Sequence, residues 1–341
     1  MNREYYHYIA VDWSIENMAI ARMTGKSNKV AVIDVPSDIG ELKMYLDNLR
    51  GGKIMTLEET TTSQWLYTEL KDHVDRLVIC DPVRNHLLSE GTKNDKIDAT
   101  KLVQLLRANL LKEVYHSAEE FLELRRLVSG YDDLVKAMVR LKNQRYSLLR
   151  AGGLTGEESK GTRLKGSVEQ RVVEGIERQL ECCEKEKEIY KGDFERLAKK
   201  HAEIRHQKSL PGIGLIGAVK IVSRVVSPSR FIDAGHYLSY SGLVKLERKS
   251  GGVLYGRKDS RYSRDLKSVY KIGAVTAIDG NNPIGDYYKY LMKEKGYPDY
   301  QARHKAARRL AILSLGVFKS GKRYQPNYRR KNNVDETSQR N

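Results

Sequence analysis

Four acidic residues stand at points in the first hundred residues that restrict the fold more than any other feature of the chain. Asp12 and Glu58 each end a short apolar run of the kind that forms a buried strand. Asp95 and Asp98 are three residues apart at the expected start of a helix, so they share one helical face. Two carboxylates at strand ends and two at a helix start predict a single acidic pocket.

Carboxylates brought together repel one another unless a cation is bound between them. No cysteine or histidine accompanies these acids in the sequence, and hard oxygen ligands suit Mg²⁺ or Mn²⁺. The pattern therefore predicts two ions per site, a two-metal arrangement suited to phosphodiester chemistry. Glu59 adjoins Glu58, and because adjacent strand residues face opposite sides of a sheet, spacing alone leaves the choice between them open.

The composition indicates the partner. The chain of 341 residues carries 61 Lys and Arg against 44 Asp and Glu, a net charge of +17, which favours a nucleic-acid partner. Its three cysteines match no zinc pattern. The sequence contains no apolar run near the 20 residues that a membrane helix needs, so we expect a cytoplasmic protein with no membrane partner.

The order of predicted elements in residues 1–115 is that of an α/β, ribonuclease H-like domain. Three short β-rich segments suggest consecutive antiparallel strands, after which helices and strands alternate. The expected strands are 7–13, 17–24, 28–36, a strand ending at Glu58, and 76–80, with helices over 38–49 and 64–74. In this fold, acids from the first and fourth strands and from a late helix converge.

Residues 116–207 have the pattern of two long helices. Ser117 and Glu120 form a plausible capping box, and apolar residues then recur at alternating three- and four-residue intervals. A second helix keeps this spacing from Val173 through Ile204, after a polar, glycine-rich segment at 151–166. An antiparallel hairpin and an intermolecular coiled coil both remain open. The second helix, at about 1.5 Å per residue, is long enough to favour self-association.

A mainly α-helical domain is expected over residues 208–321. Pro211, Gly212, Ile213 and Gly214 precede the apolar helix 215–226 and resemble a helix-hairpin-helix turn, in which the amides of Gly212 and Gly214 contact a phosphate. A left-handed turn between packed helices would have the same sequence.

A basic stretch then alternates with Tyr255 and Tyr262, which suits backbone neutralisation and base stacking. Its candidate nucleic-acid-binding residues are Lys245, Arg248, Lys249, Arg257, Lys258, Arg261, Arg264 and Lys267. An apolar helix is predicted over 306–318, where Arg308 is interpreted as a surface charge. Residues 322–341 form a basic tail, predicted to be disordered.

Several of these segments together resemble the DEDD transposases of the insertion-sequence 110 family and the related pilin-gene invertases. The matching strings are Ile9-Ala10-Val11-Asp12, Leu57-Glu58-Glu59-Thr60, Lys93-Asn94-Asp95-Lys96-Ile97-Asp98-Ala99, Leu210-Pro211-Gly212-Ile213-Gly214 and Tyr240-Ser241-Gly242-Leu243. The combination of the aspartate string with the distant Pro-Gly-Ile-Gly is specific, whereas either alone is weak.

The resemblance implies a RuvC-like version of the ribonuclease H fold, with Asp12, Glu58, Asp95 and Asp98 as the four catalytic acids. It also implies a serine nucleophile, which falls on Ser250, and a DNA transposase or recombinase that cuts and rejoins DNA through a serine-phosphodiester intermediate. The partners it implies are double-stranded donor and target DNA and an element-encoded bridge RNA as guide. The long helical stretch adds further copies of the chain, in a homodimer or homotetramer. The host would be prokaryotic, with the protein at the nucleoid.

The chain departs from the family pattern at Trp13, after the first acid, and in lacking an arginine shortly after Ser250, where we expect Arg257 or Lys258 to substitute. Two other functions remain open. A site-specific DNA invertase would use the same chemistry, and a Holliday-junction-type nuclease would use the four acids with water and would not need Ser250.

Overall fold

The structure is a computed structural model that describes residues 5–82, 94–114, 120–154, 166–258 and 260–326. The chain forms two compact units, Met1–Glu119 and Glu120–Asn341. The predicted boundaries at residues 115, 207 and 321 stay predictions. Ser117 of the expected capping box and most of the basic tail lie outside the described residues.

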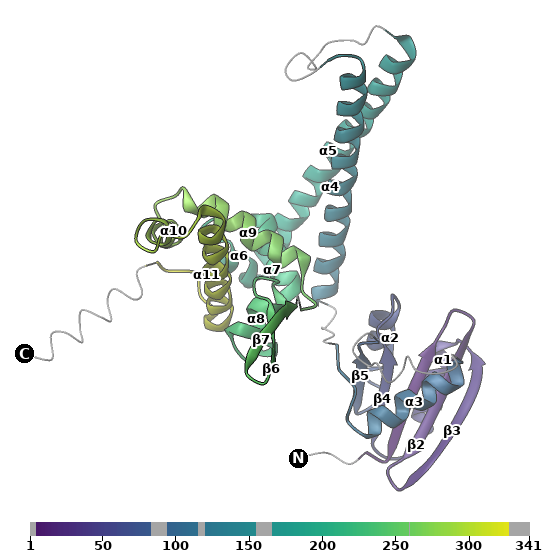
Figure 1. Cartoon of the computed structure of the whole chain (residues 1–341). Coiled ribbons are helices and arrows are strands. Elements are labelled where there is room, and N and C mark those ends of the chain that lie inside the picture. Colours follow the sequence, from purple (N-terminus) through teal and green to yellow (C-terminus); the bar gives the residue numbers. More distant parts are fainter. Residues whose placement is uncertain (1–4, 83–93, 115–119, 155–165, 259, 327–341) are drawn as a thin grey trace, which may run out of the picture. The chain divides into compact units, whose positions relative to one another are not determined.

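The first unit is a mixed α/β unit with a five-stranded sheet (Figure 1). Its elements are β1 (His7–Trp13), β2 (Asn17–Thr24), β3 (Ser27–Pro36), α1 (Ile39–Asp47), β4 (Lys53–Glu58), α2 (Ser63–Leu70), β5 (Arg76–Cys80) and α3 (Asp95–Arg107). The strand order is β3-β2-β1-β4-β5, in which β1–β2 and β2–β3 are antiparallel and β1–β4 and β4–β5 are parallel. The expected mixed sheet and its three leading antiparallel strands are thus present.

Strand alternation divides the core of this unit into two layers. On one face of the sheet, large apolar residues such as Ile9 and Val11 pack with residues of α1 and α2, including Leu42 and Leu66. On the other face, the alanines at positions 10, 19 and 21 are fully buried with residues of α3. Because alanine side chains are small, α3 lies close to β1 and β2.

The second predicted helix of this unit is shorter than expected. It was predicted over 64–74, but α2 ends at Leu70, and Val74 is instead buried in the core formed with α1 and β5. Val74 is apolar and so continued the helical pattern in the sequence, but it lies in the connection between α2 and β5.

The second unit is mainly helical (Figure 1). Its elements are α4 (Glu120–Ala151), α5 (Ser167–Lys200), α6 (Ala202–Gln207), α7 (Leu215–Val225), the 3-10 helix η3 (Pro228–Arg230), α8 (Ala234–Tyr240), β6 (Leu246–Ser250), β7 (Val253–Lys258), α9 (Arg264–Ile278), α10 (Pro283–Lys293) and α11 (Asp299–Ser320). The β6–β7 hairpin and helices α8 and α10 were not predicted. Helix α11 begins seven residues before the predicted start at 306, directly after Pro298.

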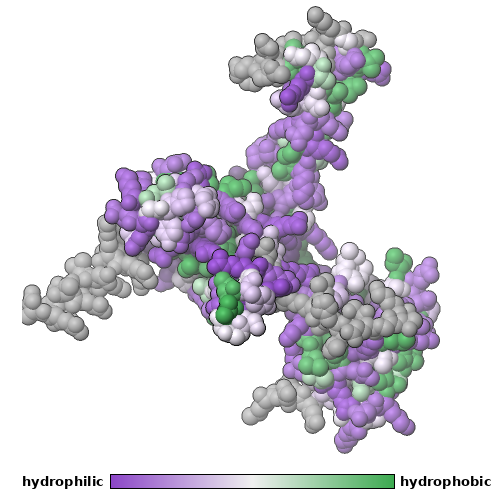
Figure 2. Space-filling model, in the orientation of Figure 1, coloured by the Kyte–Doolittle hydropathy of each residue, from purple (hydrophilic) through white to green (hydrophobic). Residues whose placement is uncertain are grey.

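Helices α4 and α5 run side by side in opposite directions, so the chain forms the antiparallel hairpin (Figure 1). Arg145 pairs with Glu177 at 2.7 Å, while farther along the hairpin the rings of Tyr131 and Phe194 lie 5.4 Å apart. The Phe194 end joins the core of the unit, since Lys220 of α7 forms an ion pair with Asp132 of α4. Figure 2 shows hydrophobic and hydrophilic residues interspersed along the hairpin surface.

The second long helix is not continuous through Ile204 as predicted. Helix α5 ends at Lys200, His201 has extended backbone angles (φ −103°, ψ 112°), and α6 begins at Ala202. The His201 side chain is buried, with its ring 6.1 Å from that of Phe121. The apolar spacing continues across this break because Ile204 is buried in the same core.

The helices within the described ranges include none that is both long and apolar enough to span a membrane.

Candidate acidic centre and nucleic-acid interface

The sheet register brings Glu58, rather than Glu59, beside Asp12. Strands β1 and β4 are parallel and pair Ala10 with Thr56 and Val11 with Leu57, so the next position along each strand aligns Asp12 with Glu58. Residues that are level in neighbouring strands face the same side of a sheet. Both side chains therefore face the side covered by α3, and Glu59 faces the other side. Spacing alone had left this choice open, and the family resemblance had implied Glu58.

Helix α3 adds the two aspartates. Asn94 caps its first turn by accepting a hydrogen bond from the backbone N–H of Lys96 at 3.0 Å, which fixes the start of the helix. Asp95 and Asp98 then fall in the first turn, where negative side chains also interact favourably with the helix dipole. Asp95 is exposed and Asp98 is half-buried.

The Asp12 carboxylate interacts electrostatically with both aspartates of α3. The pKa of Asp12 is raised from its ordinary value of 3.8 to about 6, mainly by burial and additionally by repulsion from the Asp95 and Asp98 carboxylates. One carboxylate oxygen of Asp98, Oδ1, is buried and has no hydrogen-bond partner among the described residues. A half-buried carboxylate facing like charges and an unpaired acceptor oxygen fit the donor set of a hard divalent cation. Within the described residues, however, no three His, Cys, Asp or Glu side chains lie close enough to enclose a metal ion.

Trp13 does not face the acids. It follows Asp12 in β1, so its side chain projects to the opposite face, where its ring lies 5.7 Å from that of Trp65 in α2. Tryptophan in place of the small or polar residue usual in the family therefore changes the packing against α2 and does not change the acidic face.

Ser250 is the last residue of β6, next to a tight turn. It pairs with Val253, leaving Gly251 (φ 55°) and Gly252 (φ 81°) as the two turn residues. Two successive positive φ angles define a type I′ turn, which favours glycine at both positions. The sequence Ser-Gly-Gly therefore places this hydroxyl at the exposed end of a hairpin, and Figure 2 shows a hydrophobic patch there, where Val253 and Leu254 are exposed.

The predicted basic residues lie mostly on this hairpin and on α9. Arg248 and Lys249 are in β6, Arg257 and Lys258 in β7, and Arg264 and Lys267 in α9, while Lys245 and Arg261 lie in the flanking connections. A bulge in β7 makes Tyr255 an extra residue in the strand, and its side chain is 66% exposed. A bulge re-aims side chains locally, which here presents an aromatic ring among cations.

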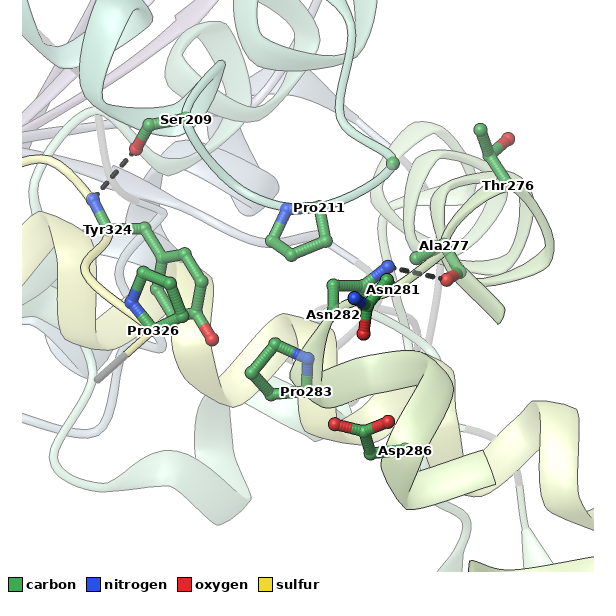
Figure 3. Close-up of a pocket in the computed structure, with 11 residues that line it drawn as sticks. Ser209, Pro211, Thr276, Ala277, Asn281, Asn282, Pro283, Asp286, Tyr324 and Pro326 are labelled. Carbon is green, nitrogen blue, oxygen red and sulfur yellow. Dashed lines mark hydrogen bonds between the residues drawn. The ribbon is translucent and has the colours of Figure 1, made fainter. Parts of the chain in front are cut away.

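The Pro211-Gly212 turn borders a cavity that, unlike the β6–β7 hairpin, is not basic. Gly212 has φ 74°, and a Cβ atom there would lie 2.0 Å from the carbonyl oxygen of Gly273 in α9. The adjoining cavity, of about 750 Å³, is lined by the acid Asp286 and by no Lys or Arg among the described residues (Figure 3). In the figure, Asn282 donates a hydrogen bond to the carbonyl of Ala277 at 2.8 Å. Close packing accounts for Gly212, and phosphate contact by Gly212 and Gly214 stays a prediction.

Three residues outside the predicted set join the basic region. Lys271 of α9 and His304 and Arg308 of α11 line a second cavity together with Lys245, Arg257 and Lys267. Arg308, predicted as a surface charge, is half-buried there. The signal in the sequence was the four-residue spacing from Lys267 to Lys271 and from His304 to Arg308, which places each pair on one helical face.

Comparisons with known proteins match both units to the same family. A DEDD transposase model of the IS110 type, described as a transposase, matches residues 9–152, and a model described as "Transposase IS116/IS110/IS902 family" matches residues 205–289. An insertion element IS116 protein of 44.8 kDa from Streptomyces clavuligerus is 28% identical over 120 residues, which is 35% of this chain and 30% of that protein. An insertion element IS110 protein of 43.6 kDa from Streptomyces coelicolor is 23% identical over 155 residues, 45% of this chain and 38% of that protein. The chain thus aligns with about a third of the length of these curated relatives.

The acid-bearing first unit and the helical second unit each match a model of the same family, and the chain belongs to the IS110 family of transposases.

Proposed function

We propose that this protein is a DNA transposase or recombinase of a mobile insertion sequence, which cuts and rejoins DNA through a covalent link to Ser250. The observation that carries the proposal is the alignment of Asp12 with Glu58 on the sheet face covered by α3, whose first turn bears Asp95 and Asp98. The strand order β3-β2-β1-β4-β5 supports a RuvC-like, ribonuclease H-type unit around these acids.

The four acids would hold the divalent cations that the DEDD family suggests, Mg²⁺ or Mn²⁺. Such ions, when bound, orient a phosphate and stabilise charge on the attacking and leaving oxygens. The protein contributes the spacing of the donors. Asp12 and Glu58 are fixed by adjacent strands, and the Asn94 cap fixes Asp95 and Asp98 in the first turn of α3.

The Ser250 hydroxyl would act as the nucleophile. Its Oγ–P bond forms while the bond from phosphorus to a deoxyribose oxygen breaks; the serine gives up its proton and the leaving oxygen gains one. Lys249 and Arg248 adjoin Ser250 on β6 and would favour the developing negative charge. The phosphoserine ester retains the energy of the broken bond, so a second DNA hydroxyl can reverse the exchange and join a new end.

Two further parts of the proposal rest on the family resemblance. A bridge RNA encoded beside the gene would pair with donor and target DNA, and the exposed cations of the β6–β7 hairpin, such as Lys258, would contact these nucleic acids. The protein would act as a homodimer or homotetramer. Exposed apolar side chains on the α4–α5 hairpin, among them Val139 and Ile189, support self-association.

The decisive experiment is to trap the covalent intermediate. DNA containing the gene and its flanks is incubated with the protein, Mg²⁺ and RNA transcribed from each flank, and protein–DNA adducts that survive denaturation are counted. We expect an adduct with the natural chain and none with Ser250→Ala. Ser229→Ala, which changes an exposed serine of η3, serves as the matched control and should retain the adduct.

Other outcomes would identify a different enzyme. If Ser250→Ala still cuts DNA and no variant forms an adduct, the protein is a nuclease that uses water. DNA that is joined by the protein alone, with no response to any flanking RNA, would indicate a site-specific invertase. Removing the divalent ion with EDTA should abolish adduct formation, and an undiminished adduct in EDTA would contradict the role assigned to the four acids.

A further inference from the structure

The base of the β6–β7 hairpin borders a cavity of about 630 Å³ that is strongly cationic. Its walls come from four parts of the second unit: the segment after α8, the two strands of the hairpin, α9 and α11. The charged residues that line it are Lys245, Glu247, Arg257, Lys267, Lys271 and Arg308. Five of these side chains are cations, and one is an acid.

The single acid does not neutralise the cavity. Glu247 lies 3.8 Å from Arg257, and it also pairs at 3.0 Å with Lys249, which is not part of the lining. Within the described residues, neither Lys271 nor Arg308 forms an ion pair. Like charges that face one another are destabilising, and more so when they are partly buried. A bound anion would remove this repulsion.

Several contacts hold the cations in place before any ligand binds. Arg308 donates a hydrogen bond from Nε to the carbonyl oxygen of Leu243 at 2.7 Å, which fixes the plane of its guanidinium group. Lys267 lies over the ring of Tyr262, 4.2 Å from its centre. Cations that are already fixed lose little conformational entropy on binding, as in arginine sites for phosphate.

His304 adds an imidazole to the same wall. Burial lowers the pKa of His304 below its usual value, and the charges of Arg308 and Lys271 lower it further. An imidazole that stays neutral beside these cations is consistent with a local excess of positive potential.

We propose that this cavity binds one backbone phosphate of the DNA strand that Ser250 attacks, and that it sets the register of that strand. The choice of DNA, and of this strand, rests on the proposed function. Glu247 at the cavity and Ser250 at the turn are three strand residues apart, which is about 10 Å at 3.3 Å per residue. The bound phosphate would then lie within a few nucleotides of the one that is cut.

The test measures binding without catalysis, so it stands whether or not Ser250 reacts. Fluorescein-labelled dT15 and rU15 are titrated with the full chain in EDTA at several KCl concentrations, and affinity is followed by fluorescence anisotropy. The variant is Lys267→Gln/Lys271→Gln. Its matched control is Lys289→Gln/Lys293→Gln, which removes two exposed lysines at the same spacing from α10. Thermal melts verify that both variants fold.

We expect the cavity variant to bind dT15 about tenfold more weakly and its salt slope, log Kd against log salt, to fall by about 0.7–1, the value for one lost phosphate contact. The α10 control should keep the slope of the natural chain. Equal losses in both variants would mean that only net charge matters, and would overturn the site. A loss confined to rU15 would also overturn it, because the strand in the cavity would then be RNA.

Discussion

At the scale of single residues, the position of a side chain along its strand decides which chemistry it can take part in. Ala10 and Asp12 project to the face of α3, whereas Val11 and Trp13 project to the other face. Asp12 therefore combines a half-buried position with neighbouring negative charges, and the raised pKa is the measurable result. A metal-free protein has to hold this carboxylate at an energetic cost.

Asp12→Asn should make the metal-free protein more stable at neutral pH. A folded-state pKa of about 6 against an ordinary value of 3.8 means that the folded state favours the protonated acid. The destabilisation is therefore absent below about pH 4, grows as the pH rises toward 6, and is complete above it. We expect a gain of about 1 kcal/mol at pH 8, allowing for solvent screening of a half-buried group. Thermal unfolding in EDTA from pH 4 to 8 measures it.

The matched control for this change is Asp72→Asn, which removes an exposed carboxylate from the same unit. It should follow the natural chain across the pH range. Equal stability of Asp12→Asn and the natural chain at pH 8 would show that the acids do not repel one another in the folded protein. The same variant should lose DNA joining, because a neutral amide is a poor ligand for a hard cation.

At the scale of elements, the junction between α6, α7 and α9 depends on the close approach of two backbones. Gly212 lies against Gly273 of α9, and Ile213 and Leu310 fill the space around that second glycine. The glycine signature in the sequence has two possible causes, phosphate contact and tight packing. At Gly212, the left-handed backbone and the contact with α9 identify tight packing as the reason for glycine.

Gly212→Ala should destabilise the second unit by about 3 kcal/mol, since a left-handed alanine costs about 1–2 kcal/mol and the clash with Gly273 forces the helices apart. Gly214→Ala is the matched control, because a Cβ atom there meets no atom of the described residues within 4 Å and φ is −82°. It should cost less than about 1 kcal/mol. Denaturant unfolding compares the two, and similar losses would rule out packing against α9 as the reason for Gly212.

The α4–α5 hairpin has exposed apolar residues that its own pairing leaves uncovered. Val139→Lys/Ile189→Lys should therefore weaken self-association at least tenfold without lowering the melting temperature, since both side chains are more than half exposed. Sedimentation over a range of protein concentrations measures it. Ile15→Lys/Ile232→Lys adds the same charge at exposed apolar residues that are not part of α4 or α5 and should leave association unchanged. An unaltered oligomer in the hairpin variant would assign the interface to another surface.

At the scale of the whole molecule, the proposed reaction needs groups from both units. The acids belong to Met1–Glu119 and the hydroxyl of Ser250 to Glu120–Asn341. Joining of DNA then requires the two units to act on one phosphodiester, either within a chain or between copies.

Mixing Asp12→Ala protein with Ser250→Ala protein distinguishes these possibilities. If copies share sites, each mixed pair contains one intact combination, and joining should recover to a substantial fraction of the natural level. Each variant alone, assayed at the same total concentration, gives the baseline. Joining that stays at this baseline in every mixture would indicate sites completed within one chain.

The sequence by itself determined the elements whose signals are local. Short β-rich runs bounded by turn residues predicted β1, β2 and β5, and the three- and four-residue spacing of apolar positions predicted two long helices where α4 and α5 lie. The acids at the strand ends were found in the same way. These features depend on neighbours in the chain, so periodicity and capping are sufficient to identify them.

Only the tertiary structure decided the features that depend on residues distant in sequence. The pairing of β1 with β4 selected Glu58 over Glu59, and the packing of α6 against the core interrupted the helix at His201. The β6–β7 hairpin was hidden because its residues are charged and exposed, without the apolar alternation that marks a half-buried strand. The cationic cavity joins Lys271 with Arg308, and no local pattern relates two helices. Burial and charge at a site are sums over all neighbours in space, and those neighbours are assigned only when the chain has folded.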